Sequence, residues 1–285
     1  QMGVEFAEES GRLRAEASRL HGAFIRLPFP SVGATENVIL AGVMAEGDTV
    51  LEGAALEPEI LTLCRFLENC GACIEGVGTG RLVIRGGRRL YGTDFTVPAD
   101  RIVAGTYLFG CMGAGGCVLL EQAPIEEMYA VMDLAVQMGG KVYTSPEGIC
   151  VQAPVRPDPV RVSTKPYPGF PTDLQSVVLA VETVGRGCSY IEEGIFENRF
   201  RILGDLCKMG AQVRQKDSRN VTVRGVASLH GACVEAKELR GGAALVVAGL
   251  MAQGETFVRG CAYIYRGYEN ICRDFRELGA RVTSV

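Results

Sequence analysis

The stretch Gly71-Ala72-Cys73-Ile74-Glu75 decides the fold, because closely similar stretches recur along the chain. Each combines a glycine stop with a short strand-like alternation of side chains. The other stops are Gly139-Gly140, Gly210-Ala211 and Gly279-Ala280, so that successive stops lie 68, 71 and 69 residues apart. Internal repetition at a fixed period is the signature of a fold built from one repeated supersecondary unit.

Each repeat contains two predicted helices and several predicted strands in the same order. A mostly apolar helix opens after a turn signal, as at residues 31–35, and a short strand such as residues 48–51 follows it. A second, amphipathic helix runs to the glycine stop, because a glycine just past a helix readily takes the left-handed conformation that ends it. Hairpin strands such as residues 81–84 then close the unit. The predicted unit is βαβαββ, an α/β (α+β) fold class, and we expect a domain break near Pro98.

A further stop at Gly3 lies 68 residues before Gly71. This phase predicts that the 285-residue sequence begins at the tail end of a unit. We therefore expect residues 1–98 to form a partial domain and residues 99–285 to form a nearly complete domain of three units.

Composition excludes several classes of function. The net charge of −4 argues against a nucleic-acid surface, and no apolar run is long enough to span a membrane. The acidic residues Glu5, Glu8 and Glu9 stand where a signal peptide would be basic. The eleven cysteines include a single C-x-x-C pair, so we expect no metal site and instead reduced, buried thiols in a cytoplasmic protein.

The predicted helix starts carry the candidate chemistry. Arg199, Arg240 and Arg266 are each predicted in the first turn of a helix, where the helix dipole disfavours a cation. Three such arginines indicate a bound phosphate or carboxylate, which arginine holds through paired hydrogen bonds. Salt bridges between domains are the alternative. By position alone, Asp173 is predicted to be a helix cap rather than a base.

Several motifs occur together over the whole chain and in a consistent order. They are Pro30-Ser31-Val32-Gly33-Ala34-Thr35-Glu36-Asn37, Glu57-Pro58-Glu59-Ile60, Asp100-Arg101-Ile102 with Gly105-Thr106, Phe170-Pro171-Thr172-Asp173-Leu174-Gln175, Phe196-Glu197-Asn198-Arg199-Phe200, Leu239-Arg240 and Arg266-Gly267-Tyr268-Glu269. With this combination the chain resembles the UDP-N-acetylglucosamine enolpyruvyl transferases of the EPSP synthase-like family.

The resemblance implies a fold of two domains, each an inside-out α/β barrel of three βαβαββ units, with ligands bound between the domains. It also implies that the first domain is incomplete here by about 130 N-terminal residues, or roughly its first one and a half units. Residues 1–98 would then be the C-terminal remainder of domain one, and residues 99–285 would be domain two.

The resemblance also implies a reaction. The enolpyruvyl group of phosphoenolpyruvate is transferred to the 3-hydroxyl of UDP-N-acetylglucosamine, the first committed step of peptidoglycan synthesis and hence of cell-wall growth, shape and division. Asp173 would take or orient the hydroxyl proton. Arg199, Arg240 and Arg266 would hold phosphoenolpyruvate. The UDP-sugar would be bound by Asp173 and by Phe29, Pro30, Ser31, Val32, Gly33 and Ile195. No cofactor, metal, membrane or nucleic-acid partner is implied, and the oligomeric state is left open.

Three departures from the family pattern remain. The Lys-Asn pair that the family has near its N-terminus is missing. No cysteine has the context of the family's loop acid, which is a Cys or an Asp, and Glu238 stands where the family has Asp before Leu-Arg. We therefore expect the 285-residue chain by itself to be inactive. The alternatives are the sister enzyme that acts on shikimate 3-phosphate and a non-catalytic, truncated paralogue.

Overall fold

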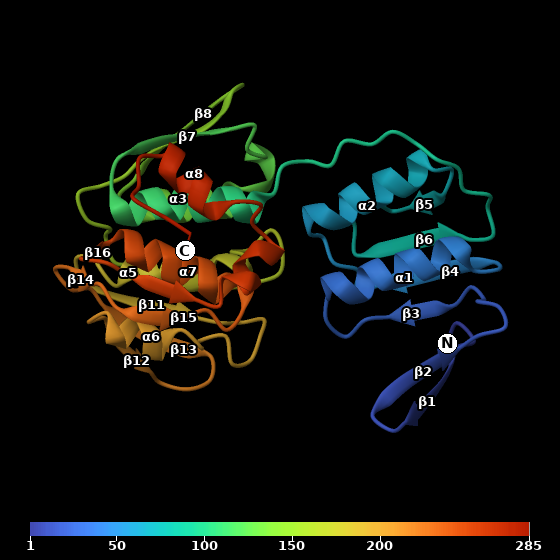
Figure 1. Cartoon of the computed structure of the whole chain (residues 1–285). Helices are drawn as coiled ribbons and strands as arrows, with labels where there is room; N and C mark the ends of the chain where they lie inside the picture. Colours follow the sequence, from blue (N-terminus) through green and yellow to red (C-terminus); the bar gives the residue numbers. More distant parts are fainter. Residues whose placement is uncertain (285) are drawn as a thin grey trace. The chain divides into compact units, whose positions relative to one another are not determined.

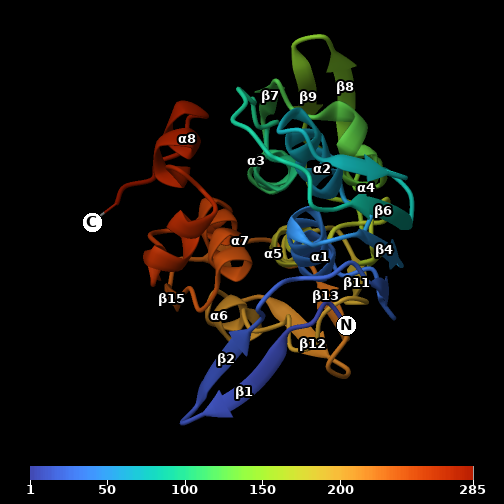
Figure 2. The same cartoon turned by 90° about the vertical axis from the view of Figure 1, so that its right-hand side faces the viewer.

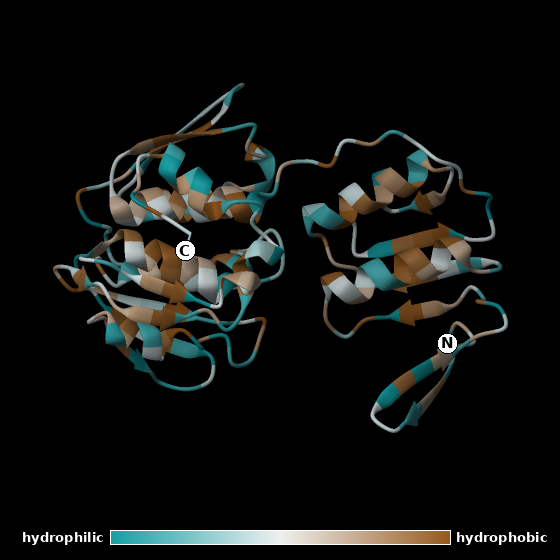
Figure 3. Cartoon of the chain, in the orientation of Figure 1, coloured by the Kyte–Doolittle hydropathy of each residue, from teal (hydrophilic) through white to brown (hydrophobic). Residues whose placement is uncertain are grey.

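The computed structural model describes residues 1–284 and divides into two compact units, drawn in Figure 1. Unit 1 comprises Gln1–Pro98 together with Pro166–Pro168. Unit 2 comprises Ala99–Lys165 and the chain from Gly169 onward. Each unit has its own cluster of buried apolar side chains. Figure 3 shows hydrophobic residues along the helices and strands of both units.

Unit 1 contains one repeat and a separate hairpin. The hairpin is β1 (Glu5–Glu9) paired with β2 (Arg12–Glu16), and all of its residues are exposed. The repeat forms a four-stranded sheet in the order β3-β4-β6-β5, in which β3 and β4 are parallel and the other pairs are antiparallel. Its elements are β3 (Phe24–Arg26), α1 (Val32–Met44), β4 (Asp48–Glu52), α2 (Pro58–Asn69), β5 (Cys73–Glu75) and β6 (Arg81–Arg85).

Unit 2 repeats this topology. Its middle repeat forms a sheet in the order β10-β11-β13-β12, again with a parallel first pair, which matches the order in unit 1. The elements are β10 (Arg161–Ser163), the 3₁₀ helix η2 (Thr172–Leu174), α5 (Gln175–Glu182), β11 (Cys188–Glu192), α6 (Leu203–Lys208), β12 (Gln212–Gln215) and β13 (Asn220–Arg224). The predicted βαβαββ unit is therefore confirmed.

The other two repeats of unit 2 are variations on this pattern. The first forms the sheet β7-β9-β8 from α3 (Arg101–Ala114), β7 (Cys117–Glu121), η1 (Ile125–Glu127), α4 (Tyr129–Gln137), β8 (Lys141–Ser145) and β9 (Gly148–Gln152). The last contains the parallel pairs β14–β16 and β15–β17. Its elements are β14 (Leu229–His230), β15 (Cys233–Glu235), α7 (Leu239–Leu250), β16 (Ala252–Gln253), β17 (Phe257–Arg259), η3 (Cys261–Arg266) and α8 (Ile271–Glu277).

The glycine stops end the second helix of each repeat in the same way. Gly71 lies at φ 100°, and its counterparts Gly139, Gly210 and Gly279 lie at φ 86°, 91° and 93°. In the first copy the Gly71 N–H bonds to the carbonyl of Glu68, and the Ala72 N–H reaches that of Leu67. The other three copies repeat both bonds, which together form a Schellman motif.

The first helices of the repeats in unit 2 are buried together. Helices α3, α5 and α7 pack against one another, and the two views in Figures 1 and 2 show them side by side. Every residue of α5 is buried, which confirms the prediction of a helix that is apolar on most faces. No helix within residues 1–284 has both the length and the apolar character needed to cross a membrane.

From the sequence, the second helices of the last two repeats are predicted to start near Glu197 and Gly267, and both predictions are wrong. Helix α6 begins at Leu203 rather than near Glu197, because Asn198 takes a left-handed conformation at φ 56° that interrupts any helix there. Helix α8 begins at Ile271 rather than near Gly267, since the Asn270 side chain caps it. Arg199 therefore lies in a loop, and Arg266 is the last residue of η3.

The prediction for the cysteines is only partly right. All eleven are free thiols, as predicted, but only Cys64, Cys70 and Cys111 are buried. The remaining thiols are half-buried or exposed, because many of them lie on strand faces that no helix covers, such as Cys117 in β7.

Candidate active site

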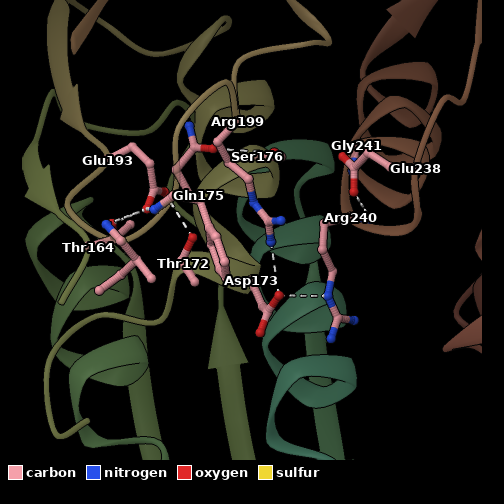
Figure 4. Close-up of polar contacts among 12 residues, drawn as sticks. Thr164, Thr172, Asp173, Gln175, Ser176, Glu193, Arg199, Glu238, Arg240 and Gly241 are labelled. Carbon is pink, nitrogen blue, oxygen red and sulfur yellow. Dashed lines mark hydrogen bonds and ion pairs between the residues drawn. The ribbon is translucent and has the colours of Figure 1, made fainter. Parts of the chain in front are cut away.

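Asp173 lies in the single turn η2 at the start of α5 and receives two arginine side chains (Figure 4). Its Oδ1 accepts a hydrogen bond from Nη2 of Arg199 at 2.9 Å and another from Nε of Arg240 at 3.1 Å. Its side chain caps neither η2 nor α5. The prediction that Asp173 is a cap is therefore wrong, because its carboxylate is drawn into ion pairs instead.

Arg240 is positioned by the first turn of α7. The side chain of Glu238 caps this helix by accepting from the backbone N–H of Arg240 at 2.8 Å and from that of Gly241. Among the three arginines, only Arg240 occupies the first helical turn that the sequence predicted. Glu238 thus supports the turn that carries Arg240, as the shorter Asp of the family pattern would also do at an N-cap.

A buried tyrosine lies beside Arg240. The hydroxyl oxygens of Tyr268 and Thr106 are 2.7 Å apart, and both side chains are buried. Burial raises the pKa of Tyr268, although Thr106 and Arg240 act in the opposite direction. Burial opposes the charge of Arg240, but the carboxylate of Asp173 outweighs it and the pKa of Arg240 is raised above its ordinary value. Arg240 therefore remains a cation.

Arg199 reaches Asp173 from the loop between β11 and α6. Its guanidinium carbon lies 5.2 Å from the centre of the Phe196 ring, a cation–π distance. The side chains of Arg199 and Arg240 are 18% and 17% exposed, against 37% for Asp173. We call Asp173, Arg199 and Arg240 the Asp173 triad. The carboxylate of Asp173 is thus the most accessible member of this triad.

The triad has unused hydrogen-bonding capacity. Nε of Arg199 and Nη1 of Arg240 are buried and have no partner within residues 1–284. Buried donors without a partner are uncommon in native proteins, so these two N–H groups point to a missing acceptor. Two guanidinium cations against one carboxylate leave a net positive charge, which favours an anion as that acceptor.

Within unit 2, neither Arg266 nor Ile195 has a hydrogen bond or ion pair to Asp173, Arg199 or Arg240 among residues 1–284. The side chain of Arg266 is exposed and forms no hydrogen bond or ion pair with the described part of the chain. The Ile195 N–H is used within unit 2, where it donates to Glu193 at 2.9 Å. The residues predicted to bind the UDP-sugar in unit 1 lie at the start of α1, where Ser31 is the cap, and they are Phe29, Pro30, Ser31, Val32 and Gly33.

Sequence reasoning missed Glu193. This residue is fully buried, and its carboxylate accepts four hydrogen bonds at the end of β11. The one available signal was that Glu193 has no acidic counterpart in the first repeat, where Gly53 follows the matching strand. The described residues contain no cluster of three or more His, Cys, Asp or Glu that could hold a metal ion.

Comparison with known proteins agrees with this site. The profile of the EPSP synthase (3-phosphoshikimate 1-carboxyvinyltransferase) family matches residues 1–275. UDP-N-acetylglucosamine 1-carboxyvinyltransferase 2 of Caldanaerobacter subterraneus subsp. tengcongensis is 41% identical over 100% of the chain and 68% of its own length. The UDP-N-acetylglucosamine 1-carboxyvinyltransferase of Desulfovibrio desulfuricans is 43% identical over 99% of the chain and 68% of its own length.

Solved structures show the same fold. The enolpyruvyl transferase NikO from Streptomyces tendae superposes with a TM-score of 0.86 at 25% identity, over 99% of this chain and 70% of that protein. The EPSP synthase of Acinetobacter baumannii gives a TM-score of 0.72 at 18% identity, with the same coverage, and so supports the fold alone. The chain spans about two thirds of the length of these relatives.

The match over residues 1–275 and the identity of more than 40% to curated transferases confirm the fold class and the family expected from the motifs. The chain belongs to the EPSP synthase family, and its curated relatives are UDP-N-acetylglucosamine 1-carboxyvinyltransferases.

Proposed function

We propose that the protein transfers the enolpyruvyl group of phosphoenolpyruvate to the 3-hydroxyl of UDP-N-acetylglucosamine, the first committed step of peptidoglycan synthesis. The observation that carries this proposal is the unequal use of the two Asp173 oxygens. Both arginines donate to Oδ1, whereas Oδ2 accepts no hydrogen bond from the residues that the structure describes. Oδ1 thus fixes the position of the carboxylate, and Oδ2 is left to accept a proton from the substrate.

Asp173 supplies the base in this reaction. Oδ2 takes the proton of the sugar hydroxyl while the hydroxyl oxygen attacks C2 of phosphoenolpyruvate, and C3 gains a proton from the loop acid of the family, a Cys or an Asp. The product is a tetrahedral ketal. Elimination then breaks the bond from C2 to the phosphate oxygen. The loop acid takes its proton back from C3, and Asp173 passes its proton to the leaving phosphate, which yields the enolpyruvyl ether and free phosphate.

The arginines supply the anion site. Phosphoenolpyruvate carries a phosphate and a carboxylate, and either group fits the buried, unpartnered N–H groups of Arg199 and Arg240. We assign Arg266 to the same substrate, since its exposed guanidinium has no partner in residues 1–284. Phe29, Pro30, Ser31, Val32, Gly33 and Ile195 are assigned to the UDP-sugar.

The cellular setting is part of the proposal. All eleven cysteines are free thiols, which suits a reducing compartment, and we place the reaction in the cytoplasm. The product feeds cell-wall synthesis and, through it, cell shape and division. We further propose that residues 1–98 and 99–285 belong to the two different domains of the family fold.

The proposal is tested by phosphate release from phosphoenolpyruvate with each of two acceptors, using the protein in the form that its gene encodes. We expect release with UDP-N-acetylglucosamine and none with shikimate 3-phosphate. The reverse pattern would identify the sister enzyme. Binding of phosphoenolpyruvate without release in the presence of either acceptor would identify a non-catalytic paralogue. Calorimetry of the 285-residue chain with phosphoenolpyruvate measures the anion site separately.

A further inference from the structure

Glu193 is a buried carboxylate at the end of β11, outside the Asp173 triad. Its Oε1 accepts hydrogen bonds from the Thr164 hydroxyl at 2.8 Å and from the backbone N–H groups of Ile195 and Phe196 at 2.9 and 3.0 Å. Its Oε2 accepts from the Thr172 hydroxyl at 2.9 Å (Figure 4). A buried carboxylate is costly unless hydrogen bonds compensate it, so these four bonds hold the group in one position.

These bonds reach both partners of the ion pair between Asp173 and Arg199. On one side, Thr172 immediately precedes Asp173 in the turn η2. On the other side, the bond to Phe196 fixes the residue whose ring lies against the guanidinium of Arg199. The carboxylate of Glu193 therefore sets the backbone that carries the base and the ring that supports its cation.

Comparison of the repeats shows that the fold does not require the carboxylate of Glu193. In three repeats, the residue that follows the matching strand donates its backbone N–H to a carbonyl across the sheet. The bonds run from Gly53 to Gly80 at 2.8 Å, from Gln122 to Glu147 at 2.9 Å and from Glu193 to Arg219 at 2.7 Å. The backbone contact thus belongs to the repeat, and it is made equally well by a glycine. Only the middle repeat of unit 2 places a carboxylate there.

The partner of this carboxylate is also specific to that repeat. The Thr164 N–H bonds to the carbonyl of Glu192, just as the Leu27 N–H bonds to that of Glu52 in unit 1. Thr164 and Leu27 are therefore equivalent positions, and a hydroxyl replaces an apolar side chain where Glu193 needs a donor. The fold requires neither the acid nor its donor.

We infer that Glu193 is a positioning residue that holds Asp173 and Arg199 in register for the reaction on phosphoenolpyruvate. The inference rests on the proposed function for what the pair does, but the coupling between Glu193 and the pair is a property of unit 2 alone.

The test removes one bond without changing the shape of the side chain. Thr172→Val deletes the hydroxyl that joins Glu193 to the Asp173 turn, and Thr172→Ser restores it. The control is Thr183→Val, which deletes a fully buried hydroxyl at the far end of α5, where it donates to the carbonyl of Ala180 at 2.6 Å, whereas Thr172 is half-buried. Each valine variant loses one side-chain hydrogen bond, and the fully buried position of Thr183 should make Thr183→Val lose at least as much stability as Thr172→Val.

In the protein in the form that its gene encodes, a positioning role predicts that Thr172→Val lowers kcat roughly tenfold with the KM of both substrates nearly unchanged, since small misplacement of reacting groups is costly. Thr172→Ser should recover most of the rate, and Thr183→Val should keep it. If Thr172→Val and Thr183→Val lose only thermal stability and turn over equally, Glu193 merely supports the fold and the inference is wrong.

A second measurement does not depend on turnover. In NMR spectra of the 285-residue chain, the Arg199 Nε–H signal and the Phe196 amide should shift in Thr172→Val and return in Thr172→Ser. Unchanged signals in Thr172→Val would overturn the inference even if the enzyme is active. Shifted signals in a chain that binds neither substrate would support the inference while the proposed function fails.

Discussion

Nε of Arg240 lies 3.1 Å from Oδ1 of Asp173, the carboxylate oxygen that Arg199 also contacts at 2.9 Å. A carboxylate that shares one oxygen between two cations is restrained in both position and rotation. Its second oxygen, Oδ2, therefore faces the same direction whenever substrate arrives, which is the preorganisation that a general base requires.

Asp173→Asn should separate catalysis from anion binding. The amide cannot take a proton, so we expect turnover to fall by about 10²- to 10⁴-fold. The same change removes the anion that competes for the two arginines, so affinity for phosphoenolpyruvate should be retained or increased. Phosphate release and calorimetry measure the two effects. A large loss of affinity would show instead that Asp173 holds the arginines in place and has no role as base.

Arg240→Lys and Arg266→Ala should differ in stability but agree in binding. Lysine cannot keep the Asp173 contact and also offer a planar second donor, so Arg240→Lys should lower both the thermal midpoint and the affinity for phosphoenolpyruvate. Arg266 is exposed and without a partner in residues 1–284, so Arg266→Ala should leave the midpoint unchanged. The affinity of Arg266→Ala for phosphoenolpyruvate should still fall. Unchanged affinity in Arg266→Ala would remove Arg266 from the site.

The sequence predicted the ends of helices better than their beginnings. A helix end such as that at Gly210 depends on a local property, because glycine takes φ 91° without strain. The loop that holds Arg199 depends on the left-handed turn at Asn198 and on the bond from the Phe196 N–H to Glu193. Glu193 is close in sequence, but distant residues, Thr164 and Thr172, bond its carboxylate. A search for helix starts cannot detect such partners.

The charged residues of the candidate site could be named from the sequence. The three arginines stood out because each was predicted in the first turn of a helix, where the dipole disfavours a cation, whereas the role of Asp173 came only from the resemblance. Their pairing did not follow from sequence, since Arg199 and Arg240 reach Asp173 from segments 26 and 67 residues away. Glu193 was missed because a glutamate after a strand is normally exposed, and only its buried surroundings reveal its function.

Glu182→Gln should change how stability depends on pH. Burial raises the pKa of Glu182 to about 7, with a smaller contribution from Asp158 and opposition from the Ser189 hydroxyl. Between the ordinary value of 4.5 and about 7 the folded state therefore holds a proton that the unfolded state has lost. The free energy of unfolding falls as pH rises through this window, by an amount on the order of 3 kcal/mol.

The glutamine variant stays neutral and should lack this decline. Urea unfolding at pH 5 and pH 8 measures it, with Glu255→Gln as the control at an exposed carboxylate in the same unit. We expect the stability difference between Glu182→Gln and the parent to grow in favour of the variant at pH 8. A difference that is the same at both pH values would show that Glu182 ionises normally.

Glu238→Ala should destabilise α7 from its first turn. The variant loses the cap on the N–H groups of Arg240 and Gly241, which typically costs about 1 kcal/mol. Glu238→Asp should keep the cap, because aspartate is a preferred residue there. Urea unfolding gives the cost, and calorimetry with phosphoenolpyruvate shows whether Arg240 has moved. Equal stability of the alanine and aspartate variants would count against the cap.

The equivalent positions Gly53, Gln122 and Glu193 have a consequence for how such a protein diverges after duplication. Each copy secures its sheet through a main-chain bond at this position, so selection on the fold constrains the backbone and leaves the side chain free. One copy was thus able to acquire an acid beside the reacting groups while its sisters kept a glycine or an amide. Duplicated units of this kind supply spare positions at which new chemistry arises without loss of the ancestral architecture.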